Sequence, residues 1–513
     1  MTCLEDEYCK RGKCIYSDIN QNHLHDRAET SVNQGKPCRR HEECDSFKGR
    51  GDGFCDSALG YQCSTRCTDD SQCVDDITYH YICRSDGRCA PDSFITIWRI
   101  PESSPTLTLL NQECRDCTFA ISWGDGSTDN AVSIGLSKLI KHTYAKGGDY
   151  VVTIKGRHFR FGWPPASENI DKDPEDPTTD GSPAKLIEVR TFGPARLSSH
   201  AFAYCENLSK LSAVDIPDAT SLNLRYAFYR AAAFNAPLDH WDVSQVTDLA
   251  SAFHNAASFN QPLDHWDTSR VTTMNRTFSG ATQFNGALDT WDVSQVTDMK
   301  AMFNDAAHFD KPVERWNTSN VTDMFGMFFG ATAFNQPLAE WKTNKVTDMS
   351  GMFANAMNFN QPIETWNTSN VTTMFAMFSH AESFNQPLEA WDTSHVTNMY
   401  GMFSSAKKFN QPLAAWNTSH VTTMKQMFES AFSFNQPLAS WDVSHVTDMY
   451  RMFYSALAYD QNLSSWLVSS GTKVDDMFKM CGMSTENLCR VYQSSTWQNK
   501  SNLGKSDNSC KER

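Results

Sequence analysis

Apolar and polar positions follow a fixed 25-residue cycle through the second half of the chain. Tryptophan recurs at this step from Trp241 to Trp466, and phenylalanine recurs at the same step from Phe228 to Phe478, without an insertion or deletion. Such a period is typical of repeat proteins, in which each unit buries its apolar side only against its neighbours. The pattern therefore predicts a stack of similar coils.

Two stretches of each unit predict two kinds of secondary structure. In Leu263-x-x-Trp266-x-Thr268 the alternation places Trp266 and Thr268 on one side of a short strand. Between Val346 and Ala356, apolar residues at i, i+3, i+4 and i+7 predict one face of a short helix, with Thr347 as its N-cap. Stacked units of this kind predict an α/β solenoid, with a parallel sheet on one side and short helices on the other.

The repeated phrase resembles a known family. F-N-Q-P-L-x-x-W-D-V-S-x-V-T-D-M-x-x-M-F-x-x-A is similar to the BspA-like branch of the leucine-rich repeats, found in surface proteins of bacteria and protists. The resemblance covers residues 184–490, including an older form of the repeat at Leu211-x-x-Val214-x-Ile216. It implies about twelve leucine-rich-repeat coils, and a role in extracellular adhesion or recognition.

The first part of the chain is rich in cysteine and poor in large apolar residues, so cross-links would have to replace a core. Eleven of the 17 cysteines lie before residue 90, and their spacing predicts disulfide modules whose connectivity stays open. Zinc is the alternative, but paired C-x2-C motifs are lacking there. The predicted disulfide residues of the two complete modules are Cys38, Cys44, Cys55, Cys63, Cys67, Cys73, Cys83 and Cys89.

The segment after the cysteines alternates apolar strands with turn clusters, which predicts a small β-sandwich. The phrases W-G-D-G-S at 123–127 and H-x-Y-x-x-x-G-x-Y-x-V-x-I at 142–154 resemble the polycystic-kidney-disease-type sandwich. Asp125 could bind a cation, although Asp-Gly is also ordinary turn chemistry. Proline and acidic residues follow and predict an extended linker.

The repeat pattern decays after residue 470, which predicts a cap over the last coil. Cys481 and Cys489 lie in this segment and predict one disulfide there. The predicted organisation is cysteine-rich modules at 1–92, a β-sandwich at 93–161, a linker at 162–183, the solenoid at 184–470, and a cap and tail at 471–513.

Charge and hydropathy narrow the class of protein. A net charge of −15 disfavours nucleic acid and anionic membranes as partners. No apolar run reaches the 18 residues typical of a transmembrane helix. The first residues lack the basic and apolar regions of a signal peptide, so we expect a mature or shortened form of a secreted protein. Cytosolic residence is the alternative, and the cysteine content argues against it.

The sequence motifs exclude common enzyme classes and leave two classes of function. The sequence lacks H-E-x-x-H, a phosphate-binding loop, G-x-S-x-G and a dinucleotide fingerprint, so neither an enzyme nor a cofactor is expected. One class that remains is a cell-surface or secreted recognition protein that binds protein or glycan on another cell or matrix. The other is a self-assembling subunit of a filament, coat or matrix. Nine N-x-S/T sequons predict a glycoprotein if the source has a eukaryotic secretory pathway.

Columns of equivalent positions are the candidate sites. The residue before each tryptophan varies without pattern, and variation within so regular a repeat indicates freedom from structural demand. We therefore predict a ligand surface along this column. Its members are His240, His265, Thr290, Arg315, Glu340 and Thr365.

Three further sets of residues carry candidate chemistry. Asp242, Asp267 and Asp292 could hold a cation, although Asp and Asn exchange freely in this column, which favours a side-chain oxygen that accepts a backbone hydrogen bond. His395, His420 and His445 recur in successive coils and could share a soft divalent metal or respond to pH; the alternative is solvated surface. Arg50-Gly51-Asp52, flanked by glycines, could be an adhesive loop or a chance match.

Overall fold

The structure is a computed structural model. It describes residues 53–56, 62–65, 81–83, 89–111, 117–134, 138–156, 159–163, 181–213, 215–497, 500 and 503–504. The chain divides into two compact units. The first comprises Met1–Val246 and Gln261–Asp267, and the second comprises Thr247–Asn260 and Thr268–Arg513.

Two short antiparallel hairpins come first in the first unit. They are β1 (Gly53–Asp56) with β2 (Gln62–Thr65), and β3 (Tyr81–Cys83) with β4 (Cys89–Pro91). Their registers place Cys55 opposite Cys63 and Cys83 opposite Cys89. The predicted disulfides of the cysteine-rich modules lie outside the described side chains, and the Arg50-Gly51-Asp52 loop lies outside the described residues.

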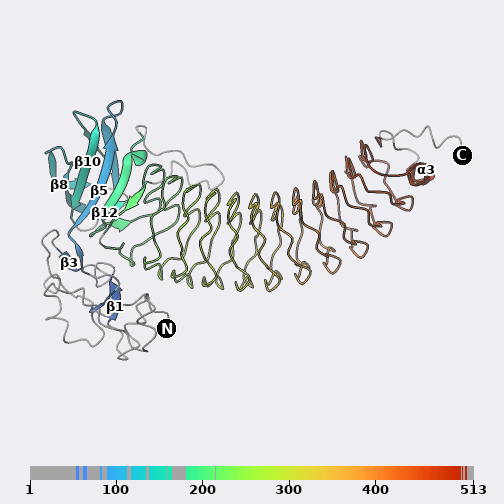
Figure 1. Cartoon of the computed structure of the whole chain (residues 1–513), viewed down its shortest axis with the longest axis horizontal. Helices are drawn as coiled ribbons and strands as arrows, with labels where there is room; N and C mark the ends of the chain where they lie inside the picture. The colour runs from blue at the N-terminus through green and yellow to red at the C-terminus, as the bar shows by residue number, and fades with distance from the viewer. Residues whose placement is uncertain are drawn as a thin grey trace. The chain divides into compact units, whose positions relative to one another are not determined.

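Two β-sheets with a shared aromatic core follow in the first unit. Their strands are β5 (Ser93–Ile100), β6 (Thr106–Asn111), β7 (Cys117–Ser122), β8 (Thr128–Ile134), β9 (Lys138–Thr143), β10 (Gly148–Lys155), β11 (Arg160–Phe161), β12 (Leu186–Thr191), β13 (Arg196–Leu197) and β14 (Lys210–Leu211). One sheet has the order β14-β12-β5-β10-β7-β8 and the other β13-β11-β6-β9. Strands β5, β8, β10 and β12 of the first sheet are labelled in Figure 1. The ring centroids of Phe94 on β5 and Phe161 on β11 are 4.9 Å apart, so apolar side chains of the two sheets meet.

Strands that come after the predicted linker complete both sheets. β12 pairs antiparallel with β5, and β14 then pairs parallel with β12. In the other sheet β13 pairs parallel with β11. Both sheets are therefore mixed, and they include residues beyond the segment from which the sandwich was predicted.

Consecutive repeats of the second unit are joined by isolated parallel β-bridges. The bridges link Asp248 to Thr273 and continue at 25-residue steps to Lys473. Figure 1 shows the repeats as a row of similar coils. Every second backbone N–H beyond a bridge donates to a carbonyl 24 residues later, at distances of 3.3, 2.7, 2.9 and 2.7 Å for Met349, Gly351, Phe353 and Asn355. Each repeat is thus a coil hydrogen-bonded to the next one.

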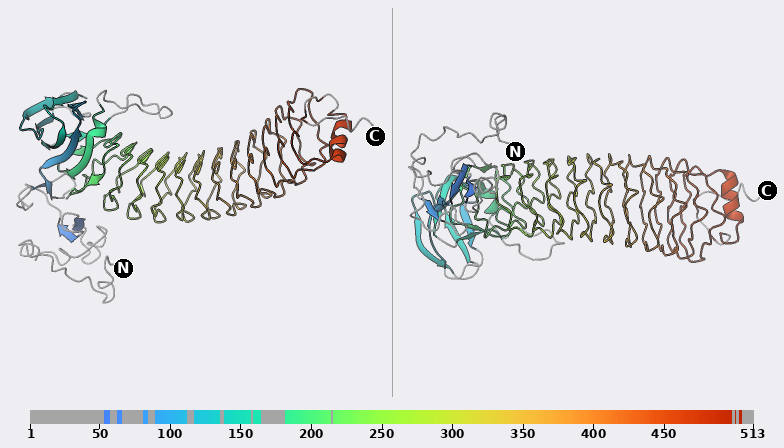
Figure 2. Two further views of the ribbon diagram at one scale, coloured as in Figure 1. Left: turned by 45° about the horizontal axis from the view of Figure 1, so that its top comes forward. Right: turned by 90° about the horizontal axis from the view of Figure 1, so that it is seen from below.

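The predicted α/β solenoid of helix-containing leucine-rich-repeat coils is wrong. Among the described residues, α3 (Thr485–Gln493) is the one α-helix, and it follows the repeats (Figure 2). The named sheets belong to the mixed arrangement of the first unit, and the repeats themselves contain turns and single bridges. The predicted parallel sheet with helices on its other side is therefore absent from the described residues.

Left-handed residues explain why the predicted helix does not form. Gly351 has φ of 61° and Asn355 has φ of 59°, and equivalent pairs four residues apart recur along the repeats. A residue with positive φ leaves the right-handed helical region, so two per coil break any i→i−4 hydrogen-bond series. Glycine and asparagine adopt this conformation at lower cost than other residues.

The strand predicted around Trp266 is also wrong, although the predicted alternation of buried and exposed side chains is confirmed. Leu263, Trp266 and Thr268 are buried and Asp267 is exposed. Turns at 264–265 and 269–270 interrupt the segment, and the β-bridge lies at Thr273 instead. Burial with period two therefore arises here without a ladder of paired strands.

Stacked aromatic columns form the core of the second unit. Trp341 is 2% exposed, and its ring lies 6.3 Å from Trp316 and 6.2 Å from Trp366 between centroids. Its indole nitrogen donates to the carbonyl of Val313 at 2.9 Å. Trp341 therefore joins apolar packing to a hydrogen bond with the preceding coil. The same bond is made by Trp316, Trp366, Trp391, Trp416, Trp441 and Trp466.

The C-terminal segment contains α3 and two cysteines of different states. Ser484 caps α3 by accepting a hydrogen bond from the backbone of Asn487. Cys481 is a buried thiol, whereas Cys489 is disulfide-bonded. The prediction that Cys481 takes part in a disulfide of this cap is therefore wrong. None of the helices that the structure describes combines the length and apolar character required to span a membrane.

Candidate functional site

The residue that follows each V-T-(D/N/T)-M segment is displayed from a fixed backbone. The N–H of Tyr400 donates to Oδ1 of Asn398 at 3.0 Å, and its carbonyl accepts from the N–H of Ala376 at 2.8 Å. Tyr450 is held in the same way, with its N–H donating to Oδ1 of Asp448 at 2.9 Å. Asn and Asp favour this local turn because their side-chain oxygens reach the N–H two residues later.

In the later coils this column carries aromatic and cationic side chains that touch one another. We call four members of this column, Phe375, Tyr400, Lys425 and Tyr450, together with Arg451, which follows Tyr450 in the chain, the aromatic–cation strip. The Phe375 and Tyr400 rings meet edge to face at 5.1 Å between centroids. The Lys425 ammonium lies 5.0 Å from the Tyr400 ring and 5.7 Å from the Tyr450 ring, so it is held between two aromatic faces.

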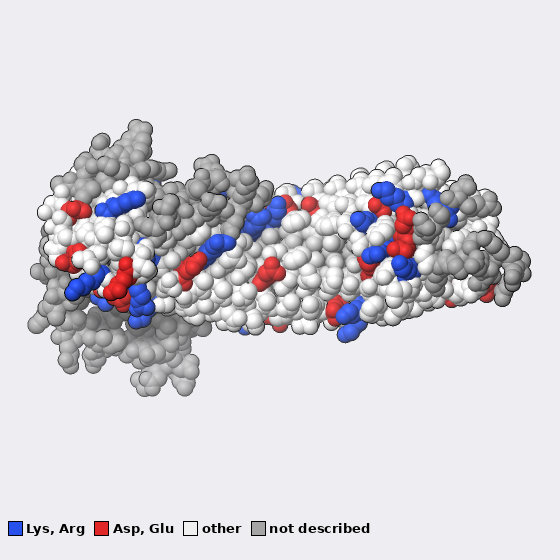
Figure 3. Space-filling model, turned by 90° about the horizontal axis from the view of Figure 1, so that it is seen from above, with Lys and Arg blue, Asp and Glu red and all other residues white. Residues whose placement is uncertain are grey.

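The strip ends at an arginine that contacts rings and acids. The Arg451 guanidinium carbon lies 5.1 Å from the Tyr450 ring and 4.7 Å from the Tyr454 ring. Its nitrogens also lie 3.9 Å from Glu429 and 3.7 Å from Asp476. On the face shown in Figure 3, charges of both signs gather toward the C-terminal end of the chain.

The strip remains accessible. Phe375 is 36% exposed, and Tyr400, Lys425, Tyr450 and Arg451 are half-buried. Tyr400 and Tyr450 each carry a phenolic hydroxyl, which can donate and accept a hydrogen bond. The arrangement therefore offers apolar ring faces, phenolic hydroxyls and positive charge to a ligand, but no nucleophile with an adjacent base.

The column predicted to bind ligand is mostly exposed. Thr290, Arg315, Glu340 and Thr365 are exposed. His240 and His265 of the first unit are half-buried and gather around Asp239, at 3.7 and 3.5 Å from its carboxylate. The His240 hydrogen bond is the largest cause that lowers the pKa of Asp239. Ligand binding along this column stays a prediction.

The aspartate column forms local turns. Oδ1 of Asp242 accepts from the N–H of Ser244 at 3.2 Å, and Oδ1 of Asp292 accepts from that of Ser294 at 2.9 Å. The interpretation that this column needs a side-chain hydrogen-bond acceptor is confirmed at these positions. Asp267, the remaining member, is exposed.

The histidine column lies on the surface. His395, His420 and His445 are exposed, and Nδ1 of each ring lies 3.3 Å from the hydroxyl of the preceding serine. Across the described part of the chain, no three His, Cys, Asp or Glu side chains lie where they could together hold a metal ion. The predicted metal sites in both columns therefore gain no support from the geometry.

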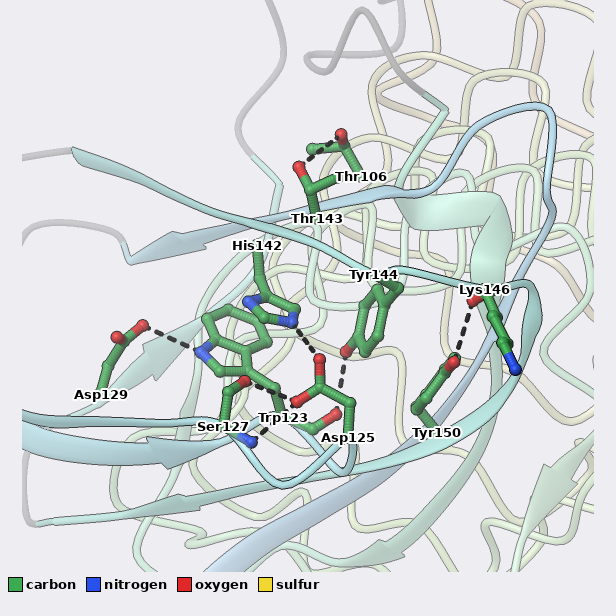
Figure 4. Close-up of polar contacts among 10 residues, drawn as sticks. All are labelled: Thr106, Trp123, Asp125, Ser127, Asp129, His142, Thr143, Tyr144, Lys146 and Tyr150. Atoms are coloured by element: carbon green, nitrogen blue, oxygen red, sulfur yellow. Dashed lines mark hydrogen bonds and ion pairs between the residues drawn. The ribbon is translucent and has the colours of Figure 1, made fainter.

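Asp125 of the first unit joins two motifs that are distant in the sequence (Figure 4). Its Oδ1 accepts from the N–H and hydroxyl of Ser127 at 2.9 and 2.5 Å, and its Oδ2 lies 2.8 Å from Nε2 of His142. The His142 ring stacks on Trp123 at 4.7 Å between centroids, and the Tyr144 hydroxyl donates to the Trp123 carbonyl. These contacts show Asp125 acting in a turn, the second of its two predicted roles.

Acid is expected to weaken the first unit through Asp125. The Ser127 hydroxyl is the first cause that lowers its pKa from 3.8 to about 2. A depressed folded pKa contributes stability that is full above the unfolded value of about 3.9 and is lost as pH falls through the folded value. Thermal melts between pH 5 and 2 should therefore fall less steeply for Asp125→Asn than for the native chain.

A control variant tests whether this effect is local to the turn. Glu340→Gln removes an exposed carboxyl in the second unit and should leave the slope of melting temperature against pH unchanged. Parallel slopes for the native chain and Asp125→Asn would show that this carboxylate contributes nothing to the acid sensitivity.

The strip was missed by sequence reasoning, although the sequence contains a signal for it. The columns predicted to bind ligand lie on the predicted sheet face next to the tryptophans, whereas the strip lies in the segment that was predicted as a helix. Its column carries Ala250, Asn275 and Ser350 in some coils but large aromatic or basic residues in others. Such variation at a position with a fixed backbone indicates that the side chain is presented to a ligand.

The repeats match one family model in three consecutive segments. The model is described as Mycoplasma protein of unknown function, DUF285, and it covers residues 198–314, 304–396 and 384–491. A search of curated proteins gave no match.

Proposed function

The chain belongs to the family described as Mycoplasma protein of unknown function, DUF285, and since that description assigns no function, we propose one from the site. We propose that the protein recognises a protein or glycan at the aromatic–cation strip. A large aromatic residue offers contact area at little cost in conformational entropy, and Tyr and Arg are enriched among the residues that dominate binding energy. Ring faces can stack on the apolar faces of sugars, while the hydroxyls and cations bond to polar groups.

The observation that carries the proposal is the unbroken contact from Phe375 to Tyr450 across successive coils, which continues to the adjacent Arg451. Each side chain touches the next through a ring contact of 5.0 to 5.7 Å. Each coil also shares several backbone hydrogen bonds with the following one. Such a surface is preorganised, which reduces the entropy lost on binding.

We further propose that recognition takes place outside the cell or at its surface. The support is the cysteine-rich N-terminal segment and the resemblance of the repeat phrase to BspA-like surface proteins. In this setting the protein acts in adhesion, and its partner is a protein or glycan of another cell or of a matrix.

A binding array with the full chain tests the proposal. A ligand found on glycan or protein arrays should lose at least tenfold in affinity, on the order of 1.4 kcal/mol or more, when Tyr400→Ala and Tyr450→Ala are combined. The matched control combines Arg315→Ala and Glu340→Ala in the column first predicted to bind. If the tyrosine variant bound as tightly as the native chain while the control variant lost affinity, the ligand would bind at the column of Arg315 and Glu340 instead of the strip.

The alternative function is a structural subunit that assembles through its repeats. Size-exclusion chromatography with light scattering on the same samples separates the two. A discrete species that binds ligand supports recognition, whereas open-ended growth with concentration supports the structural alternative.

A further inference from the structure

A buried histidine of the first unit, His200, has no part in the proposed recognition. The residue is 4% exposed, and neither of its ring nitrogens makes a hydrogen bond to the described residues. Burial of a polar group without a hydrogen bond costs stability, and an imidazole in such surroundings stays neutral. The side chain is therefore not explained by a stabilising hydrogen bond.

The backbone at this position does not require an imidazole. The N–H of His200 donates to the Arg225 carbonyl at 3.0 Å, and the residue has φ of 64°. Gly351, Ala376 and Gly401 donate to the following coil in the same way at 2.7, 2.8 and 2.8 Å, also with positive φ. Small residues thus suit this conformation in later coils, so the fold alone does not explain the histidine.

His200 connects the aromatic core of the sheets to the next turn of chain. Its carbonyl accepts from the N–H of Trp163 at 3.0 Å, and the Trp163 ring lies edge to face with Trp98 of β5 at 6.4 Å between centroids. The His200 ring stacks on Tyr226 at 4.5 Å, with 11° between the planes. The residue therefore contacts the sheet core through its backbone and the next turn through its ring.

The groups around the ring disfavour its protonation. Burial is the largest cause that lowers the pKa of His200 from 6.5 to about 4, and the charge of Arg225 is the second. The Arg225 guanidinium carbon lies 5.5 Å from the Tyr226 ring. The Ser199 backbone acts in the opposite direction and more weakly, and no described carboxylate contributes. Tyr226 and Tyr229, with rings 5.7 Å apart, are phenols and gain no charge in acid. A charge on the imidazole would therefore lack a counter-ion among the described residues.

We propose that His200 is an acid-sensitive latch in the first unit. While the imidazole is neutral, it stays stacked on Tyr226 and joins that turn to the sheet core through Trp163. When it gains a proton, the charged ring leaves the stack for water, because an unpaired charge is far more costly to bury than a neutral ring. Mild acid thus opens this part of the first unit, independently of the aromatic–cation strip.

The direction of the pH effect follows from the lowered pKa. Between pH 6.5 and about 4 the open form binds a proton at this ring that the closed form does not bind. The latch is therefore most stable above pH 6.5, and its closing equilibrium weakens by up to about tenfold for each pH unit below that value. Asp125 acts at lower pH, since its folded pKa is about 2, so the two effects can be separated.

Hydrogen exchange of the full chain tests the latch. After correction for intrinsic exchange rates, protection of the amides of residues 163 and 200 should fall by up to about tenfold per unit between pH 6.5 and 5. This fall should vanish in His200→Phe, which keeps a ring without a proton site, and in His200→Gly, which suits the left-handed backbone. His420→Gln is the matched control, because His420 is exposed, and it should behave as the native chain. A fall that persists in both His200 variants, or its absence from the native chain, would overturn the proposal.

The protonation state of the ring gives a second readout. In NMR spectra of the full chain with labelled histidines, the imidazole signal that is missing from His200→Phe should be that of a neutral ring at pH 5 while the amides of residues 163 and 200 remain protected. A charged ring at pH 5 together with protected amides would contradict the proposal, because the latch would then carry the charge and stay closed.

Discussion

Trp341→Ala is expected to lower the free energy of unfolding by roughly 3–5 kcal/mol, the range for large-to-small changes in a packed core. The indole is 2% exposed and stacks on Trp316 and Trp366. Its removal also leaves the Val313 carbonyl without the indole donor. Equilibrium denaturation with urea, followed by circular dichroism, measures the change.

The damage should extend into the adjacent coils, because each coil is stabilised mainly by its neighbours. Hydrogen exchange should therefore rise at the backbone amides of Trp316 and Trp366 as well as at position 341. Glu340→Ala is the matched control, since Glu340 is the exposed neighbour in sequence, and it should change the stability by less than about 0.5 kcal/mol. A loss below about 1 kcal/mol for Trp341→Ala would contradict its place in the core.

The sequence predicted which side chains are buried better than it predicted the backbone that carries them. The 25-residue step identified the tryptophan and phenylalanine columns, because a buried position must stay apolar in every coil. The same i, i+3, i+4 spacing suits a helix or a series of turns. The conformations at 351 and 355 decide between them, and the Gly, Asn, Asp, His and Ser found at the latter position in other coils were the signal.

Long-range pairing limited the prediction of the first unit. β12 pairs with β5 although about ninety residues separate them, and neither strand has a sequence feature that specifies the other. By contrast, the contact between Asp125 and His142 joins the two sequence phrases that resemble the polycystic-kidney-disease-type sandwich. The sequence therefore identified both motifs as strand and turn signals, whereas their contact and the sheet order came from the structure.

The asparagine of each F-N-Q-P segment forms a ladder between coils that should contribute strongly to stability. Oδ1 of Asn360 accepts from the N–H of Asn385 at 2.9 Å and from Nε2 of Gln386 at 3.1 Å. Asn360→Ala removes this acceptor and leaves a half-buried backbone donor without it. We expect a loss of about 1–3 kcal/mol in the free energy of unfolding, measured by urea denaturation.

The chain itself supplies the matched control for this ladder. Asp310 occupies the equivalent position two coils earlier, and its Oδ1 accepts from the N–H of Asn335 at 3.0 Å and from Nε2 of Gln336 at 2.8 Å. A carboxylate can therefore replace the amide oxygen, and Asn360→Asp should retain most of the stability at pH 7. If Asn360→Asp were as unstable as Asn360→Ala, the loss could not be assigned to the missing acceptor, because the carboxylate of Asp also supplies an oxygen that accepts hydrogen bonds.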